Sequence, residues 1–305
     1  MMEPIIYFDR LSKKKLEEKV YGQKALQFLY GDDLLSRCFG APLLHLLSRI
    51  SFFSAFVGYW QSRPFTKKKI ASFIHQYQIE ASEFKNQISD FKSFNDFFIR
   101  ELKKESRPIA KSEATIPADG RYWFYPQISS ANFFYVKNKT FNLISLLKDE
   151  KLAHRYEHGS MVIARLCPSD YHRFHFPCDG VPHETKLLNG WLYSVNPLAL
   201  KKDFEILTTN KRTLCCLDTK KFGQVLYLEV GATSVGSIHQ TYQPFQPCCK
   251  GDEKGYFSFG GSTLILLFEP QTIQFDQDLV QASKEGLEIR CLMGQSMGSS
   301  IKSSS

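Results

Sequence analysis

GYFSFGGSTLILLFEP, residues 255–270, contains two apolar and aromatic runs separated by a Gly-Gly-Ser-Thr sequence. Short runs of this kind, bounded by glycine or proline, are typical of β-strands. Four similar runs lie between residues 121 and 238: RYWFYPQI, NFFYVKNKT, SMVIARLC and GQVLYLEVGATSVGSI. We therefore expect a β-rich domain that extends from residue 106 to residue 293.

The first 105 residues show a different pattern. Their apolar side chains recur at helical spacing over three stretches, residues 11–29, 34–60 and 67–84. A shorter helix is expected at residues 142–148, and the small polar residues 294–305 are expected to form a flexible tail. The predicted fold class is α+β, with helices over residues 1–105 that precede the β-rich catalytic domain.

The positive charge of the chain is concentrated in this helical part. The net charge is +8, and the first 110 residues contribute +6 of it, with 18 Lys and Arg against 12 Asp and Glu. Between Leu34 and Ile79 there is no acidic residue. The same stretch contains the most apolar segment, residues 41–60, but His45 and Arg49 interrupt it. We therefore expect amphipathic helices and not a membrane-spanning helix.

A basic segment with an apolar face fits the interface of an anionic bilayer. The alternative is a set of helices that pack their apolar face on the rest of the protein, and the stretch by itself favours this second interpretation. Nucleic acid is a third candidate partner, but no recognition motif supports it. The eight cysteines lack the C-x-x-C spacing of a zinc or redox site, so we expect no metal and a reducing compartment.

Two polar motifs precede the glycine-rich sequence. Asp119 lies in the turn PADG, residues 117–120, where an aspartate is most often a turn cap. His172 and His175 lie in CPSDYHRFHFPCDG, residues 167–180. Two histidines three residues apart are candidates for metal ligands, for a general base or for an ordinary surface turn, and the aromatic residues between them favour a packed, functional segment.

Ser262 follows Gly260 and Gly261 at the start of an apolar run. The simplest interpretation is a glycine bulge in a strand. A serine-hydrolase nucleophile would stand in Gly-x-Ser-x-Gly before a helix, which this sequence does not match. A bent Gly-Gly-Ser segment can also bring the Ser262 hydroxyl onto the carbonyl carbon of Gly261, because glycine tolerates strained backbone.

Six motifs together resemble the phosphatidylserine decarboxylase family in order and spacing. They are FNDFFIRELKKESRPI (94–109), PADG (117–120), YHRFHFPCDG (171–180), SVNP (194–197), VGATSVGSI (230–238) and FGGST (259–263). One departure is Gly260, where the family usually has a branched or long apolar residue. This difference affects the expected rate of self-cleavage but keeps the Gly-Ser bond.

The resemblance implies that the chain is a zymogen cleaved between Gly261 and Ser262, into a β chain, residues 1–261, and an α chain, residues 262–305. Ser262 then becomes a covalent pyruvoyl group, the cofactor. The resemblance assigns the base for cleavage to His175 and its orienting carboxylate to Asp119. It also implies that phosphatidylserine is decarboxylated to phosphatidylethanolamine through a Schiff base to the pyruvoyl group.

The proton donor of that reaction is expected to be His172, with His175 as the competing candidate. A phospholipid substrate favours the membrane interpretation of the basic helices, so we expect a peripheral protein on the cytoplasmic side of the cell membrane. The family commonly forms dimers, which implies that the cleaved α–β heterodimer pairs again. Two alternatives are a serine hydrolase that uses Asp119, His175 and Ser262 without self-cleavage, and an inactive membrane-binding scaffold.

Overall fold

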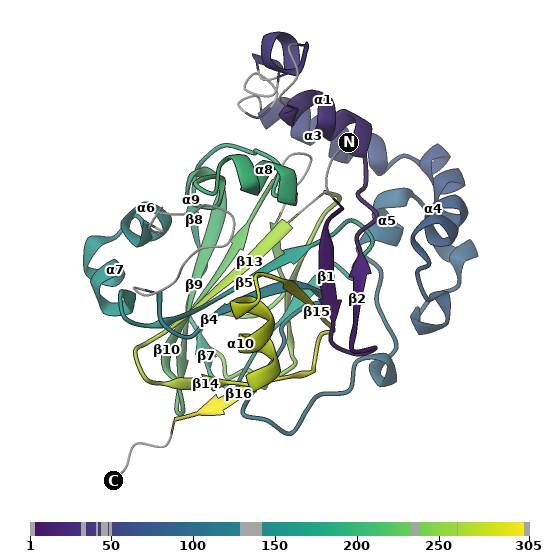
Figure 1. Ribbon diagram of the computed structural model, residues 1–305. Coiled ribbons are helices and arrows are strands. Elements are labelled where there is room, and N and C mark those ends of the chain that lie inside the picture. The colour runs from purple at the N-terminus through teal and green to yellow at the C-terminus, as the bar shows by residue number, and fades with distance from the viewer. Residues whose placement is uncertain are drawn as a thin grey trace.

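The computed structural model in Figure 1 describes the chain except residues 1–3, 32–34, 41, 44–47, 49–50, 129–141, 233–237, 261 and 302–305. Within the described part, a sheet of ten strands forms the centre of the fold. Its order is β2-β1-β15-β4-β5-β13-β10-β9-β7, and β8 also pairs with β9. The strands are β1 (Ile6–Asp9), β2 (Lys14–Glu17), β4 (Gly120–Tyr125), β5 (Ser160–Leu166), β7 (Val181–Pro182), β8 (Lys186–Leu188), β9 (Arg212–Thr219), β10 (Gly223–Val230), β13 (Ser262–Phe268) and β15 (Glu288–Cys291).

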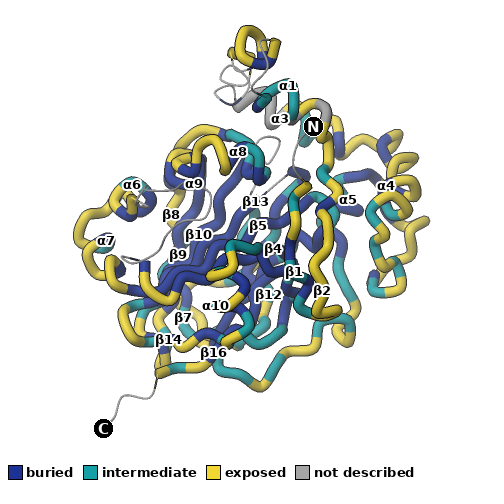
Figure 2. The backbone as a smooth tube through the Cα atoms, in the orientation of Figure 1, coloured by how far each residue is buried: buried dark blue, intermediate teal, exposed yellow. Residues whose placement is uncertain are grey.

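The central strands are apolar on both faces because both faces of the sheet are covered. In β4, Tyr122 and Phe124 join one hydrophobic core, whereas Trp123 and Tyr125 join the other. β13 lies between β5 and β10 and is antiparallel to both. Burial on both sides explains why these strands read as continuous apolar runs without alternating polar residues. Figure 2 shows the same strands as the buried interior.

Two small sheets and one helix cover the first face. The sheets are β11 (Ile238–Gln240), β12 (Glu253–Phe257) and β6 (Arg173–His175), and β14 (Ile273–Phe275), β16 (Ser296–Ser300) and β3 (Ala114–Thr115). The helix is α10 (Gln277–Lys284). Four short helices contribute to the core of the second face: α6 (Leu143–Leu147), α7 (Glu150–Tyr156), α8 (Pro197–Lys202) and α9 (Ile206–Thr209).

The amino-terminal helices lie at one end of the sheet (Figure 1). Their elements are α1 (Gln23–Tyr30), η1 (Ser36–Gly40), α3 (Ser51–Gln61), η2 (Pro64–Lys68), α4 (Lys69–Tyr77), η3 (Ala81–Glu83), η4 (Ile88–Asp90), α5 (Phe94–Phe98) and η5 (Lys104–Ser106). A third hydrophobic cluster, rich in phenylalanine, joins α4 and α5 to Phe259, just after β12. This cluster attaches the helical layer to the loop that precedes Ser262.

The structure confirms a mixed helical and β-rich fold, and it corrects two predictions. The helix predicted over residues 11–29 is wrong in its first half, because β1 and β2 form a hairpin that extends the large sheet. The flexible tail predicted over residues 294–305 is wrong for its described part, because β16 pairs with both β14 and β3. Both errors concern strands whose partners are distant in sequence.

Other predicted elements are found where they were expected. The short helix predicted at residues 142–148 is α6, and the β-runs around residues 121, 160, 223 and 255 form β4, β5, β10, β12 and β13. α4 lies within the helix predicted over residues 67–84, and α3 overlaps the one predicted over residues 34–60 and ends one residue beyond it. The run at residues 132–140 lies outside the described residues. Among the described helices, none combines the length and apolarity needed to cross a bilayer.

Candidate active site

Ser262 is the first residue of the central strand β13. Its register partner in β5 is Leu166, so the strand pairing sets Ser262 beside the segment that carries both histidines. Ser262 has no exposed surface, and its Oγ has no hydrogen-bond partner. Gly260 has a φ of 142°, a backbone conformation that residues with a side chain rarely adopt. Gly261 itself lies outside the described residues.

His172 is buried beside this segment. Its Nδ1 lies 3.0 Å from the carbonyl oxygen of Asp170, and its ring centroid lies 3.8 Å from that of Phe98. A carbonyl oxygen only accepts hydrogen bonds, so Nδ1 carries the proton and Nε2 keeps its lone pair. Nε2 has no partner. Burial lowers the pKa of His172 to about 3, although the charge of Asp170 and the backbone carbonyl groups of Asp170 and Gly260 act to raise it.

His175 has a parallel arrangement at the end of β6. Its Nδ1 lies 3.0 Å from the carbonyl oxygen of Gly251, and its Nε2 is buried without a partner. Its backbone N–H donates to Pro117 O at 2.8 Å, which joins β6 to the PADG turn. Burial lowers the pKa of His175. Both histidines are therefore neutral at pH 7, and each has one ring nitrogen available as a base.

Asp119 is not hydrogen-bonded to His175 in this structure. Its carboxylate accepts hydrogen bonds from Arg107 Nε at 2.9 Å and Arg107 Nη2 at 2.6 Å. It also accepts one from the backbone N–H of Met293 at 2.8 Å. Arg107 also forms a two-pronged ion pair with Glu83, at 2.9 Å for both contacts. The structure thus places His175, at the end of β6, next to the turn that carries Asp119, and the two segments are joined through the backbone and not through these side chains.

Buried polar atoms without a partner are concentrated at this place. Among the described residues, four buried polar atoms without a hydrogen-bond partner belong to the two motifs: His172 Nε2, His175 Nε2, Ser262 Oγ and Thr263 Oγ1. Folded proteins leave few buried polar groups unpaired, because each one costs about 1–3 kcal/mol. A concentration of unpaired nucleophile and base atoms is what nucleophilic chemistry requires. We refer to these four residues as the reactive cluster.

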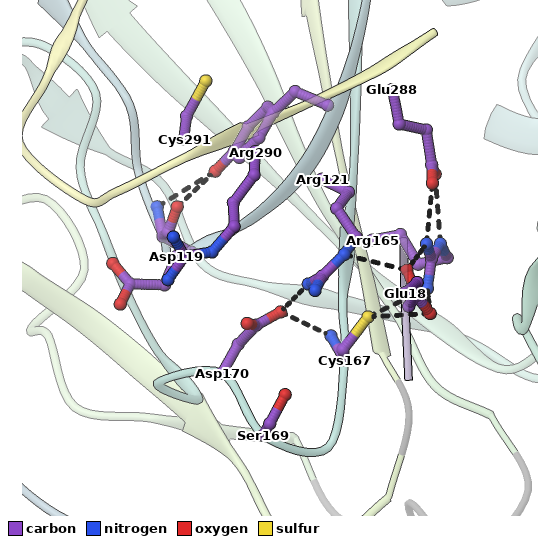
Figure 3. Close-up of polar contacts among 12 residues, drawn as sticks. Glu18, Asp119, Arg121, Arg165, Cys167, Ser169, Asp170, Glu288, Arg290 and Cys291 are labelled. Carbon is purple, nitrogen blue, oxygen red and sulfur yellow. Dashed lines mark hydrogen bonds and ion pairs between the residues drawn. The ribbon is translucent and has the colours of Figure 1, made fainter. Parts of the chain in front are cut away.

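A second group of buried side chains lies on the neighbouring strands, and all of its carboxylates and guanidinium groups are paired (Figure 3). This ion network consists of Glu18, Arg121, Arg165, Asp170 and Glu288. Arg165 Nη2 lies 2.6 Å from Glu18 and 2.7 Å from Glu288, and Arg121 lies 2.8 Å from both Glu18 and Asp170. Burial raises the pKa of Glu18, but the charges of Arg165 and Arg121 outweigh burial and lower it to about 2.

The ion network continues into the reactive cluster through Asp170. The carboxylate of Asp170 accepts a hydrogen bond from the backbone N–H of Cys167 at 2.7 Å, and the backbone carbonyl oxygen of Asp170 accepts one from His172 Nδ1. Arg100 also donates to the carbonyl oxygens of Ser169 and Asp170, at 3.1 Å each. These contacts fix the turn of residues 167–170 and, with it, the orientation of the His172 ring.

Comparisons with known proteins agree with this site. A family model described as phosphatidylserine decarboxylase matches residues 94–299. The phosphatidylserine decarboxylase proenzymes of Chlamydia pneumoniae and Chlamydia caviae are each 50% identical to this chain, over 96% and 99% of its length and over 97% and 100% of their own. That of Chlamydia trachomatis serovar D is 45% identical over 98% of both chains. The chain belongs to the phosphatidylserine decarboxylase family.

Sequence reasoning missed the ion network of this phosphatidylserine decarboxylase family member. Arg121 and Arg165 stand inside the otherwise apolar runs GRYWFY and SMVIARL, which was the available signal, because a charge in a buried strand requires a partner. Glu18 gave no such signal, since it follows an exposed strand and precedes the residues matched by the family model.

A cavity of about 270 Å³ opens beside the reactive cluster. One wall is formed by α1 and the residues just before it, and a second by the turn of residues 166–169. Residues 194–196, from the SVNP motif, form a third wall, and Phe259 and Gly260 close the cavity next to the cleavage motif. A mostly apolar cavity beside unpaired reactive groups is the expected form of a substrate site.

Proposed function

We propose that this chain decarboxylates phosphatidylserine to phosphatidylethanolamine and that it first cleaves itself to convert Ser262 into a pyruvoyl group. The observation that carries this proposal is the reactive cluster. It combines a buried serine hydroxyl with two neutral imidazoles whose Nε2 atoms are unpaired, in a chain of the phosphatidylserine decarboxylase family. No metal enters the proposal. Among the residues that the structure describes, no group of three His, Cys, Asp or Glu side chains is arranged to hold one.

Self-cleavage begins, in this proposal, when His175 Nε2 takes the proton of Ser262 Oγ. The oxygen bonds to the carbonyl carbon of Gly261, the amide bond breaks, and the released amine receives the proton. Elimination of the resulting ester gives Gly261 a carboxylate and leaves dehydroalanine at position 262. Dehydroalanine then takes up water and loses ammonia to become the pyruvoyl group at the start of residues 262–305.

Asp119 supports His175 indirectly in this scheme. Arg107 and the Met293 N–H fix its carboxylate, and the same turn offers Pro117 O to the N–H of His175. The turn therefore sets the position of β6 from which the His175 ring extends. Asp119 is thus proposed as a positioning residue for the base, and its removal should slow cleavage without abolishing it.

The pyruvoyl carbonyl supplies an electron sink for the loss of CO₂. The residues of the chain exclude water and control the proton. His172 is fully buried and its Nε2 is open, so we assign to it the transfer of a proton to the carbon that loses CO₂. His175 remains the competing donor. The kcat of decarboxylation by a cleaved His172→Gln enzyme distinguishes the two assignments, because only a donor at His172 predicts a large loss.

We assign binding to the membrane surface to the amino-terminal helices. Among large apolar side chains, Trp60 is 47% and Phe65 50% exposed, and Phe56 and Tyr59 are also exposed. The cations of η2 and α4 accompany them, residues 67–69. An exposed apolar surface next to cations fits an anionic bilayer at the cytoplasmic face. Sedimentation with phosphatidylglycerol vesicles at low salt tests this, with phosphatidylcholine vesicles as the control. Failure to sediment with the anionic vesicles would make the helices purely structural.

Mass spectrometry of the purified protein tests the proposed function directly. We expect two chains, residues 1–261 and 262–305, and a blocked amino terminus on the second. Active protein that stays a single chain of 35.2 kDa would contradict the pyruvoyl mechanism and favour a serine hydrolase. We also propose that the two chains remain together and pair with a second copy. Analytical ultracentrifugation should then give a mass of about 70 kDa, twice that of the intact chain.

A further inference from the structure

Arg100 is a buried cation in the motif of residues 94–109, just after α5, and it is only 4% exposed. Arg121 and Arg165 are buried with carboxylates beside them, whereas among the described residues no carboxylate forms an ion pair with Arg100. Burial lowers the pKa of Arg100 to about 10, so its guanidinium remains charged at pH 7. A buried charge without a counter-charge is costly to the fold. Its position therefore indicates a task other than stabilisation.

The guanidinium of Arg100 holds the turn that leads to the histidines. Its Nη2 donates to the carbonyl oxygens of Ser169 and Asp170 at 3.1 Å each, and its Cζ lies 4.8 Å from the centroid of the Phe97 ring. The carbonyl oxygen of Asp170 also accepts a hydrogen bond from His172 Nδ1 at 3.0 Å. A single oxygen atom therefore joins the Arg100 cation to the imidazole of the reactive cluster.

The position of this oxygen decides which nitrogen of His172 carries the proton. In a neutral imidazole either nitrogen can be the donor, and the acceptor that one of them meets selects the tautomer. Here Nδ1 meets the Asp170 oxygen and Nε2 is left without a partner. If the carbonyl group turned away, the proton would no longer be confined to Nδ1. Besides burial, the charge of Arg100 also lowers the pKa of His172, whereas the charge of Asp170 raises it.

We propose that Arg100 is a positioning residue that acts through the Asp170 carbonyl group to keep the proton of His172 on Nδ1 and its Nε2 free. The proposal rests on the proposed decarboxylase function, in which His172 transfers a proton, and adds to it the residue that orients this donor. The guanidinium holds two successive carbonyl groups, so residues 169–170 cannot rotate without losing both contacts. Arg100 forms no hydrogen bond with the four residues of the reactive cluster, so its effect is indirect.

Histidine ¹⁵N NMR of the uncleaved Ser262→Ala protein tests this orientation without any decarboxylation. The signals of His172 are identified by their loss in His172→Gln. We expect a proton on Nδ1 alone at pH 7 when Arg100 is present. Arg100→Gln should move the two nitrogen signals of His172 toward each other, as in a mixture of tautomers. Unchanged signals in a folded Arg100→Gln protein would overturn the proposal.

Arg212→Gln is the matched control. Arg212 is also buried, burial likewise lowers its pKa to about 10, and among the described residues it has no carboxylate partner. It donates to the carbonyl oxygens of Leu146, Ser145 and Asn210, on the second face of the sheet. Its removal takes away the same kind of side chain without touching residues 167–170, so the signals of His172 should stay unchanged.

The cleaved enzymes provide a second measurement, with rates expressed per mole of the chain that begins at residue 262. Arg100→Gln should lower kcat at least about tenfold and change KM less than about threefold, because a displaced donor affects the reaction more than binding. In a His172→Gln background, Arg100→Gln should lower kcat no further. A further loss of the same size would show that Arg100 acts elsewhere and would overturn the proposal.

If Arg100→Gln does not fold, Arg100→Lys decides the outcome, since an ammonium group does not reproduce the geometry of a guanidinium between two carbonyl oxygens. It should move the His172 signals in the same direction and lower kcat at least about threefold. Unchanged signals in this variant would overturn the proposal. Absence of decarboxylation in the unaltered protein would instead contradict the proposed function, and the NMR measurement would then decide the role of Arg100 by itself.

Discussion

The ion network and the reactive cluster are both groups of buried polar side chains, and they are joined through Asp170. The first group is fully paired, whereas the second keeps polar atoms without a hydrogen-bond partner. In the ion network, Glu18 and Arg165 exchange short contacts with groups of opposite charge. In the reactive cluster, His175 Nε2 and Ser262 Oγ have no partner. Buried charges require pairing to be tolerated at all, whereas unpaired neutral groups impose a smaller cost. The ion network therefore supports the fold, and the unpaired atoms of the reactive cluster are the ones to which we assign the proposed chemistry.

Ser262→Ala should produce the largest functional effect of any change in the reactive cluster. The variant is expected to remain one chain and to lose decarboxylation to background, because no pyruvoyl group can form. Electrophoresis and CO₂ release measure the two quantities. Cleavage of this variant would refute the assignment of the nucleophile.

Glu18→Gln should have the largest effect on stability. It leaves Arg165 and Arg121 without a shared carboxylate in a buried site, which typically costs about 3–5 kcal/mol. The measurement is urea unfolding in the uncleaved Ser262→Ala background, where the protein is a single chain. Glu17→Gln is the matched control, because Glu17 is its exposed neighbour in β2. Equal stability of the two variants would show that the ion network does not support the fold.

Acidification should remove the stabilising contribution of the buried histidines at a higher pH than that of the ion network. The pKa of His172 is lowered by burial from 6.5 to about 3, so the unfolded chain binds more protons between these values. The contribution of this histidine to the free energy of unfolding is therefore complete above pH 6.5. It is lost as the pH falls, by up to about 1.4 kcal/mol per pH unit for each such histidine. Glu18, with a pKa lowered from 4.5 to about 2, loses its contribution only below pH 4.5.

Unfolding in the Ser262→Ala background between pH 6.5 and 5 thus reports on the histidines. His172→Gln should reduce the slope of stability against pH in this range. Glu18→Gln should leave that slope unchanged and lower the whole curve. A slope that does not respond to His172→Gln would mean that this imidazole is protonated in the folded protein.

Thr263→Val should have the smallest effect of the four changes. It replaces a buried hydroxyl without a partner by a methyl group of similar shape, so unfolding free energy should stay constant or rise by up to about 1 kcal/mol. Urea unfolding in the same background provides the measurement, with self-cleavage of the single variant followed by electrophoresis. A loss of more than about 1 kcal/mol in the free energy of unfolding would show that the Thr263 hydroxyl forms a stabilising hydrogen bond.

The parts of this fold that depend on local pattern were predictable. β12 and β13 follow from the apolar runs around the Gly-Gly-Ser-Thr sequence, and α6 from a short helical signal with Asn142 as its cap. β1 and β16 were not predictable. Their few residues form strands only because β15 in one case, and β14 and β3 in the other, provide an edge to pair with.

The candidate site also has a part that could be predicted from the sequence and a part that could not. His172, His175 and Ser262 were predicted from their motifs, and the structure adds that His172 Nε2, His175 Nε2 and Ser262 Oγ are buried and unpaired. The pairing of Asp119 with Arg107 was not predictable, because a sequence gives no indication of which cation a carboxylate meets. Which lone pair of each histidine is available depends on carbonyl oxygens such as Gly251 O, whose position is a property of the fold.

The parallel pairing of β1 with β15 has a consequence for how the protein is made. Ile6–Asp9 is synthesised long before its partner Glu288–Cys291, and Arg10 likewise waits for Asp276 and Asp278. β1 therefore joins the sheet only after β15 has been synthesised, and contacts so distant in sequence form slowly. In the proposed mature enzyme, residue 262 begins a separate chain, and that order of assembly is lost. A denatured mature enzyme should consequently fail to renature, and its lifetime would be set by its rate of unfolding.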